Sequence, residues 1–356
     1  MEITSRLRNY NVILENDMDF LRSLARKENA QFVIDEKVWR LYREKLEDIP
    51  SERLILIKAT EENKVIETAL GICEKITAIP AKRNAVLISI GGGIIQDITG
   101  FVANITYRGI HWIFVPTTLL AACDSCIGGK TSLNYKRYKN LLGTFFPPEE
   151  IHICSDFFHT LSERDYKSGL GEVVKFNIMA GRDSLSGMER HIDALLAREP
   201  QTVLAYVEKS LNFKKRYIEA DEFDQGERIK LNFAHTFGHA IEVVSNYAIP
   251  HGTAVAMGMI MADRVSVRRG ILDVSVARQA ELLLLRVISI DTSPLKVPTE
   301  RILQAMRKDK KQTSTALTAV LLANYGEVAE LNVVHDIQPE EIADAVGYFV
   351  DLYEGR

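Results

Sequence analysis

The chain has 356 residues, of which 46% are hydrophobic and 26% charged, and its 44 Lys and Arg against 48 Asp and Glu give a formal net charge of -4. This length suggests two domains, each able to bury a core of its own, and the composition excludes disordered and collagen-like chains. The acidic balance argues against a nucleic-acid partner, because neutralising phosphates needs a surplus of basic residues. We therefore expect a soluble two-domain enzyme.

The compartment follows from the apolar stretches and the cysteines. No apolar stretch is long enough to span a membrane, and the N-terminus lacks the apolar core of a secretory signal. The four cysteines, Cys73, Cys123, Cys126 and Cys154, are too few for a disulfide scaffold. We interpret the C-x-x-C pair at Cys123 and Cys126 as small buried residues, with a redox or zinc role as the alternative. We expect a cytoplasmic protein without a membrane partner.

Strands and helices alternate in the first part of the chain. Strand-length apolar runs rich in β-branched residues occur at residues 31–35, 54–59, 85–90, 111–116 and 151–155. Helical patterns lie between them, for example at residues 37–45 and 64–77. This alternation predicts a Rossmann-like α/β domain with a mostly parallel sheet over residues 1–158.

Beyond about Phe158 the pattern changes to long amphipathic helices. They are expected at residues 163–179, 200–220, 230–247, 253–269 and 274–285, with one short strand pair near residues 317–331. The sequence therefore predicts an α/β domain followed by a mainly helical domain over residues 159–356.

A triple glycine, Gly91 to Gly93, lies directly after the strand at 85–90 and before a helical pattern. Glycines at such a junction let backbone N–H groups approach a pyrophosphate at the start of the helix. The spacing differs from G-x-G-x-x-G, so a tight structural turn is the alternative. We favour a nucleotide-binding turn.

Three of the eight histidines lie within residues 235–251. His235 and His239 are four residues apart and share one face of a helix, and His251 follows in a turn that opens another helix. Such a set, completed by a carboxylate, suits a catalytic divalent ion. The carboxylate candidate is Glu172 in the segment GLGEVVK. The grouping favours a metal site over histidines that are simply buried in a core.

Basic residues lie at Gly-rich turns and near the histidines. They are Lys130, Lys139, Lys214, Arg228 and the run Lys308, Lys310 and Lys311. Each alone is more often a solvated surface residue. Together they suit a phosphate or carboxylate substrate.

These motifs together resemble the sugar phosphate cyclases, a family whose best-known member is 3-dehydroquinate synthase. The matching blocks run from about Asp35 to Lys311 and include GGGIIQDITGF (91–101), VPTTLLAACDSCIGGKTSLN (115–134), LSERDYKSGLGEVVKF (161–176) and PHGTAVAMGM (250–259). The related metal-dependent polyol dehydrogenases share the two-domain plan but lack the GGKT and GEVVK blocks. The resemblance implies an NAD-binding α/β domain and a helical domain that binds metal and substrate.

The resemblance also implies a role for individual residues. The metal, zinc or else cobalt, is held by Glu172, His235 and His251, so that His239 contacts substrate, contrary to the interpretation from spacing. The positions matching NAD contacts are Asp35, Glu61, Lys64, Gly91, Gly92, Gly93, Ile94, Ile95, Gln96, Asp97, Thr117, Thr118, Lys130, Lys139, and Phe157 to Thr160. The positions matching substrate contacts are Asp124, Lys130, Asn140, Lys175, Lys214, Arg228, Asn232, His239 and Lys310 or Lys311.

Four of the substrate-side positions carry the catalytic roles in this resemblance: Asp124, Lys130, Lys175 and His239. Arg108 matches a residue that reaches the phosphate of the neighbouring subunit, which implies a homodimer. The implied reaction closes a sugar phosphate into a ring with loss of phosphate. It is redox neutral, because the hydride given to NAD is returned in the same turnover.

Four positions depart from the family pattern, and they bear on which sugar phosphate is the substrate. Gln96 and Ala234 stand where glycine is usual, Thr253 replaces Glu, and Glu227 replaces an apolar residue. Retention of Lys214, Arg228, Asn232 and the DKK run favours 3-deoxy-arabino-heptulosonate 7-phosphate, converted to 3-dehydroquinate in the shikimate pathway. The alternatives are a 2-epi-5-epi-valiolone, 2-deoxy-scyllo-inosose or amino-dehydroquinate synthase, a polyol dehydrogenase, and a non-catalytic nucleotide-binding relative.

Overall fold

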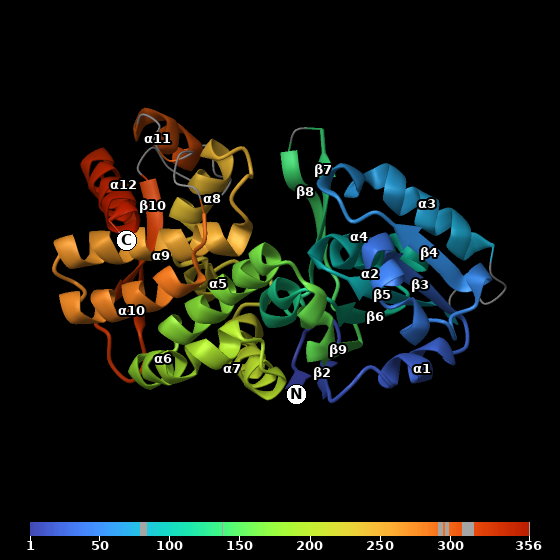
Figure 1. The fold of residues 1–356 in the computed structure, drawn as a ribbon. Coiled ribbons are helices and arrows are strands. Elements are labelled where there is room, and N and C mark those ends of the chain that lie inside the picture. Colours follow the sequence, from blue (N-terminus) through green and yellow to red (C-terminus); the bar gives the residue numbers. More distant parts are fainter. Residues whose placement is uncertain (79–83, 137, 291–294, 296–298, 308–316, 356) are drawn as a thin grey trace. The chain divides into compact units, whose positions relative to one another are not determined.

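The computed structural model describes residues 1–355 except 79–83, 137, 291–294, 296–298 and 308–316. The chain divides into two compact units, Met1–Leu161 and Ser162–Arg356, called here the first and second units (Figure 1). Among the described helices, none combines the length and the hydropathy that crossing a membrane requires.

A seven-stranded sheet forms the centre of the first unit, in the order β1-β2-β9-β6-β5-β3-β4. The pairings are parallel except for β1 with β2, which confirms the predicted mostly parallel sheet. Phe32, Ile88 and Phe114 on the central strands have no exposed surface, as expected for a sheet covered on both faces. The strands are β1 (Glu2–Ile3), β2 (Tyr10–Glu15), β3 (Ala30–Asp35), β4 (Leu54–Ile57), β5 (Val86–Gly91), β6 (His111–Pro116) and β9 (Glu150–Cys154).

Among the described residues of this unit, four α-helices accompany the sheet: α1 (Phe20–Ala25), α2 (Glu36–Leu41), α3 (Ile66–Thr77) and α4 (Gly93–Ile105). The helix expected over 37–45 breaks after Leu41, and residues 43–45 form a separate 3-10 turn. The helix expected from residue 64 begins at Ile66, because the Lys64 backbone is not helical. An antiparallel hairpin, β7 (Lys130–Tyr135) and β8 (Tyr138–Phe145), was not predicted.

The second unit is mainly helical, as predicted. Its elements are α5 (Glu163–Met179), α6 (Arg182–Leu196), α7 (Pro200–Ala220), α8 (His235–Val244), α9 (His251–Arg268), α10 (Val274–Val287), α11 (Thr299–Arg307), β10 (Leu317–Ala323), β11 (Glu330–Ile337) and α12 (Pro339–Glu354). Helix α9 packs against α5, α8, α10 and α12 (Figure 1). Its residues from Gly252 to Asp263 are all buried, so α9 is the core helix of this unit.

Helices α5 and α9 touch through their backbones at two glycines. A Cβ atom added to Gly171 would lie 2.1 Å from the carbonyl oxygen of Gly252, and one added to Gly252 would lie 1.8 Å from the carbonyl oxygen of Ser168. A similar approach joins α9 to α8, where a Cβ on Gly258 would lie 2.5 Å from the Ala234 carbonyl oxygen. Only glycine permits such separations, so these residues fix where the three helices cross.

The helix expected over 230–247 begins later, at His235. Residues 227–232 form a 3-10 turn, and Ala234 adopts a left-handed conformation with φ of 68° immediately before α8. Ala234 stands where the family pattern has glycine, the residue that takes this conformation without a steric cost. The strand pair expected near 317–331 is present and extends to Ile337.

Candidate functional site

Several of the predicted nucleotide contacts meet at the carboxyl edge of the parallel sheet. The register of β3 against β5 pairs Ile34 with Ile90, so Asp35 lies beside Gly91 at the strand ends. On the other side, β6 pairs Pro116 with Gly91, and the Thr117 amide donates to the Gly91 carbonyl at 2.9 Å. The carboxyl ends of parallel strands are where open α/β sheets bind ligands.

The triple glycine forms the turn between β5 and α4. A Cβ on Gly91 would lie 2.6 Å from Ile95 Cγ1, and a Cβ on Gly92 would lie 3.0 Å from Thr118 Cγ2. Helix α4 then begins at Gly93 with Gly92 at its N-cap position, where no side-chain cap is present. The first amides of α4 are therefore left to donate hydrogen bonds to an anionic group, with Ile94 to Asp97 in the opening turns.

Lys64 connects the loop after β4 to the start of α4. Its side chain, 6% exposed, lies 2.5 Å from Asp97 Oδ2 and donates to Asn140 Oδ1 at 2.6 Å. Ser132 donates to both Asp97 oxygens, each at 3.1 Å. Burial raises the pKa of Asp97, although Lys64 and Ser132 favour the charged carboxylate. Four residues far apart in sequence thus form one polar network.

We expect Lys64→Met to destabilise the first unit, because it leaves Asp97 without its counter-charge. The loss of stability should be smaller than the about 3–5 kcal/mol typical of breaking a buried ion pair, because Asp97 keeps its Ser132 bonds and is 20% exposed. The melting temperature measures it. The exposed Lys58→Met is the control, and the double variant with Asp97→Asn should recover much of the stability. An equal fall in melting temperature in Lys64→Met and in the control Lys58→Met would contradict the prediction.

The other first-unit candidates lie next to strand ends and on the hairpin β7–β8. Glu61 accepts from Asn134 Nδ2 at 2.7 Å, and burial raises the pKa of Asp35, whose carboxylate caps α2. Phe157 is buried, and Thr160 bonds the Tyr42 hydroxyl at 2.7 Å. The remaining candidates lie on β7, on β8, in a left-handed turn before β6 and in the turn after it: Lys130, Lys139, Arg108 and Asp124.

Gln96, one of the departures from the family pattern, is buried on α4. Its Nε2 donates to the Ser125 carbonyl at 2.7 Å, and its Oε1 accepts from Ser125 Oγ at 2.6 Å. Gln96 thereby ties α4 to the turn at residues 121–125. Cys123 and Cys126 are both buried beside this turn, and Cys126 Sγ bonds the Ala122 carbonyl. They are free cysteines, consistent with the role of small buried residues.

Glu172, His235 and His251 come together in the second unit. One donor atom from each lies within 4.8 Å of the others, as ligands of a single ion require. Glu172 is fully buried, and its Oε1 lies 3.7 Å from His235 Nε2 and 3.3 Å from His251 Nε2. The glycine contacts explain the convergence, since Glu172 follows Gly171 on α5 and His251 precedes Gly252 on α9.

Hydrogen bonds orient both imidazoles so that Nε2 faces Glu172. His235 Nδ1 lies 3.0 Å from the Phe233 carbonyl, and His251 Nδ1 lies 3.1 Å from Glu242 Oε2. Metal-binding histidines commonly hold their second nitrogen in this way. Burial disfavours the charged imidazole, but the bonds to Glu172 and Glu242 outweigh it and raise the pKa of His251 to about 10. A metal ion binding at neutral pH therefore has to displace a proton from His251.

His239 lies beside the other two histidines rather than in the first donor set. Its ring centroid is 5.4 Å from that of His235 and 5.9 Å from that of His251. A second set that could hold an ion joins His239, Glu242 and His251. Sequence reasoning did not single out Glu242, although it lies three residues after His239 and seven after His235, on the same helical face.

The basic candidates of the second unit differ in their surroundings. Lys175 is 1% exposed, and its Nζ lies 2.5 Å from Glu172 Oε2, one turn along α5. Lys214 and Arg228 are also buried, and an Arg228 guanidinium nitrogen donates to the Glu222 carbonyl at 2.5 Å. Asn232 is partly exposed at the end of the 3-10 turn before α8. Lys310 and Lys311 lie outside the described residues.

Comparison with known proteins covers nearly the whole chain. The family model for the 3-dehydroquinate synthase N-terminal region matches residues 54–168, and the model for the C-terminal region matches residues 169–312. The 3-dehydroquinate synthase of Dictyoglomus turgidum is 37% identical over 319 residues, which cover 89% of this chain and 88% of the relative.

Two solved structures of sugar phosphate cyclases have the same fold. The 2-epi-5-epi-valiolone synthase of Streptomyces hygroscopicus, with NAD+ and Zn2+ bound, has a TM-score of 0.84 at 23% identity, covering 98% of this chain and 99% of its own. A 2-deoxy-scyllo-inosose synthase complexed with carbaglucose-6-phosphate, NAD+ and Co2+ has a TM-score of 0.84 at 23% identity, covering 97% and 98%. The resemblance drawn from the sequence blocks is confirmed, and the chain belongs to the 3-dehydroquinate synthase family.

Proposed function

We propose that this protein is a metal- and NAD-dependent lyase that cyclises 3-deoxy-arabino-heptulosonate 7-phosphate to 3-dehydroquinate with loss of phosphate. The observation that carries the proposal is the buried convergence of Glu172, His235 and His251, with Lys175 held against Glu172. Relatives named 3-dehydroquinate synthase, 37% and 36% identical over about nine tenths of the chain, support it.

The donor set fits a divalent ion, zinc or else cobalt. Two imidazoles and one carboxylate are the ligands of many catalytic zinc sites, and both imidazoles present Nε2 to the buried Glu172. When bound, the ion supplies Lewis-acid polarisation of a substrate hydroxyl. His239, beside this set and partly exposed, is positioned to exchange a hydrogen bond with the substrate.

The glycine turn fits the pyrophosphate of NAD, because added Cβ atoms at Gly91 and Gly92 would collide with Ile95 and Thr118. NAD bound at this turn would supply a reversible acceptor for a substrate hydride. We expect Asp35, at the end of the neighbouring strand β3, to contact the bound NAD, with Glu61 and Lys64 near the adenosine ribose. Thr117 and Thr118 line the other side of the turn.

Buried basic residues support a substrate with several negative charges. Lys175, Lys214 and Arg228 are each less than a tenth exposed, so their charges are weakly screened by solvent. Glu227, the acidic departure beside Arg228, is 64% exposed and bonds Lys230 Nζ at 2.7 Å. Its charge is therefore offset and does not oppose a substrate carboxylate at Arg228.

A panel of sugar phosphates tests the function. Protein loaded with zinc or cobalt and NAD is assayed for phosphate release from 3-deoxy-arabino-heptulosonate 7-phosphate, sedoheptulose 7-phosphate and glucose 6-phosphate, with product masses. We expect release from the first alone. Release from another member would identify one of the related cyclases. Accumulation of NADH with an alcohol and no phosphate release would indicate a polyol dehydrogenase.

We expect Glu242→Gln to weaken metal binding by about 10–100-fold, the usual effect of removing a group that orients a ligand. The amide cannot hold the His251 Nδ1 proton as a carboxylate does, although the side chain keeps its size. Competition with a fluorescent zinc chelator measures the affinity directly. Glu163→Gln, an exposed change on α5, is the control. An unchanged zinc affinity in Glu242→Gln would contradict the orienting role.

The homodimer and the cytoplasmic location are parts of the same proposal. Arg108 is exposed in a left-handed turn, which leaves its guanidinium accessible to a second subunit. Light scattering after size exclusion tests the dimer, and phosphate release by Arg108→Ala tests the shared contact. The four free cysteines are consistent with a reducing compartment.

A further inference from the structure

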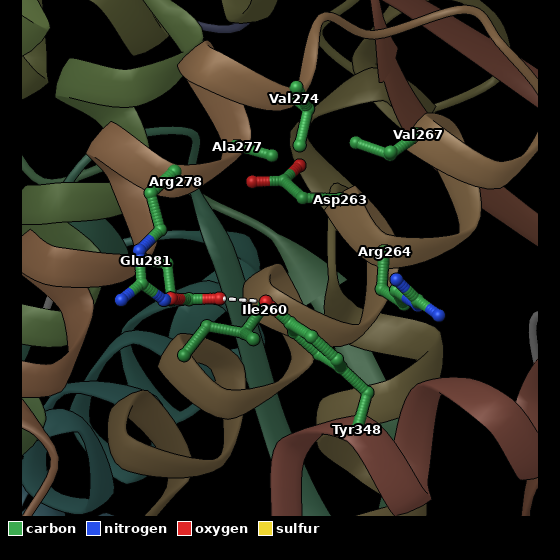
Figure 2. A pocket seen from close by; sticks show the side chains of 9 residues that line it. All are labelled: Ile260, Asp263, Arg264, Val267, Val274, Ala277, Arg278, Glu281 and Tyr348. Carbon is green, nitrogen blue, oxygen red and sulfur yellow. Dashed lines mark hydrogen bonds and ion pairs between the residues drawn. The ribbon is translucent and has the colours of Figure 1, made fainter. Parts of the chain in front are cut away.

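A small cavity in the second unit lies among α9, α10 and α12, apart from the residues proposed to bind metal and substrate. Its volume is about 60 Å³, and its apolar wall is formed by Ile260, Val267, Val274 and Ala277 (Figure 2). Val274 is 67% exposed, which places part of this wall at the surface. A cavity of this size has room for water or for one small organic ion.

Asp263 of α9 points into this cavity. Figure 2 shows its carboxylate directed toward Ala277 and Val274 of α10. The residue is 2% exposed, and neither carboxylate oxygen has a hydrogen-bond partner among the described residues. A buried carboxylate without a donor or counter-ion is strongly disfavoured as an anion. Asp263 therefore requires either a proton or a cation that enters the cavity.

The charged neighbours of Asp263 on each packed element already have partners. On α10, Glu281 accepts from the Tyr348 hydroxyl of α12 and from Arg278 (Figure 2). On α9, Arg264 pairs with Asp344 at 2.8 Å. The Tyr325 hydroxyl, which interacts electrostatically with Asp263, donates to the Ile178 carbonyl at 2.8 Å. None of these groups is arranged to neutralise Asp263.

The side chains that line the cavity indicate which kind of cation it can bind. A bare calcium or magnesium ion needs about six oxygen ligands, and the cavity offers the two of Asp263 beside Glu281 and Tyr348 oxygens that are hydrogen-bonded to each other. The described residues of the lining include no histidine or cysteine, the side chains that most often hold zinc. An alkylammonium ion instead supplies N–H donors, which the carboxylate lacks, and a methyl group that the apolar wall accommodates. We propose that this cavity is a binding site for a small primary ammonium ion, with Asp263 as its counter-ion.

Proton and cation compete for the same carboxylate. Burial and the nearby Glu281 raise the pKa of Asp263 well above its ordinary value. Because the folded state then holds a proton that the unfolded state releases, stability falls as pH rises above the ordinary range of an aspartate. A cation that replaces the proton should restore stability, and its apparent affinity should increase with pH. This site is independent of the proposed catalytic function.

Methylammonium chloride is the probe, added to the metal- and NAD-loaded protein at pH 7 and pH 9. We expect the melting temperature to rise by several degrees, more at pH 9 than at pH 7. Sodium chloride and tetramethylammonium chloride, which lacks N–H donors, should have no such effect at equal ionic strength. Equal shifts with all three salts would overturn the proposal.

Asp263→Asn keeps the shape and removes the charge. We expect this variant to be more stable than the wild type at pH 9 and insensitive to methylammonium, whereas the exposed Asp183→Asn should respond as the wild type does. A wild-type response in Asp263→Asn overturns the proposal. Line broadening of 13C-labelled methylammonium by the wild-type protein is a second measurement, expected at pH 9 and weaker at pH 7. Absence of broadening at both pH values also overturns it, and leaves a proton as the occupant.

Discussion

Replacing Glu172 by glutamine is expected to abolish stoichiometric metal binding and to lower phosphate release by more than the about 10–100-fold typical of residues that only orient a ligand. The change removes the single negative charge from the donor set, and one amide oxygen is a much weaker ligand than a carboxylate. It also leaves Lys175, 1% exposed, without its partner. An uncompensated buried charge costs about 3–5 kcal/mol, so the metal-free variant should unfold at a lower temperature than the metal-free wild type.

Two effects of Glu172→Gln can be measured separately. Metal content by mass spectrometry and phosphate release report the loss of metal binding, and thermal unfolding reports the loss of stability. Glu163→Gln on the same helix is the matched control, because Glu163 is 75% exposed and pairs with Lys167 at the surface. The stability of the Glu163→Gln variant should differ from that of the wild type by less than about 1 kcal/mol. Full metal content and full activity in Glu172→Gln would remove Glu172 from the site.

Gly171→Ala is expected to be among the most damaging single substitutions in the second unit. The new Cβ would lie 2.1 Å from the Gly252 carbonyl oxygen, which belongs to the backbone of the core helix and cannot rotate away. Helices α5 and α9 must separate, which creates voids in a packed core and moves Glu172 away from His251. We expect a loss of stability of at least about 1–3 kcal/mol, the typical cost of overpacking, together with weaker zinc binding.

The matched control is Gly347→Ala on α12, where an added Cβ meets nothing within 4 Å. Because alanine is favoured over glycine in a helix by about 1 kcal/mol, this variant should be slightly more stable than the wild type. Melting temperature and chelator competition are measured on both. If Gly171→Ala retains the stability and the zinc affinity of the wild type, the backbone contact does not determine the geometry of the site.

The central strands and the long helices could be predicted from the sequence because their patterns reflect burial. Strand β5 is buried on both faces and reads as a continuous apolar run, and α5 and α7 begin and end at the predicted residues. Hairpin β7–β8 has no such pattern, since β8 is mostly exposed and its residues resemble a loop. The start of α8 was missed because a left-handed Ala234 breaks the helix without any glycine or proline to signal it.

The site was predictable in its donor residues but not in the groups that hold them. Spacing alone favoured His235 and His239 as the metal pair, with His251 as a third histidine nearby, whereas the set of Glu172, His235 and His251 depended on the family resemblance. The bond from His251 to Glu242, and the network of Lys64 with Asp97 and Asn140, join residues by tertiary contact alone. No local periodicity in the sequence encodes such pairs.

The backbone contacts at Gly171, Gly252 and Gly258 have a consequence for folding. They bring together donor residues from three helices, so the complete donor set exists only in the folded second unit. An ion that binds this set stabilises the folded state in proportion to the logarithm of its concentration. The melting temperature of this unit should therefore rise with the amount of metal bound, and it can be measured without substrate or turnover.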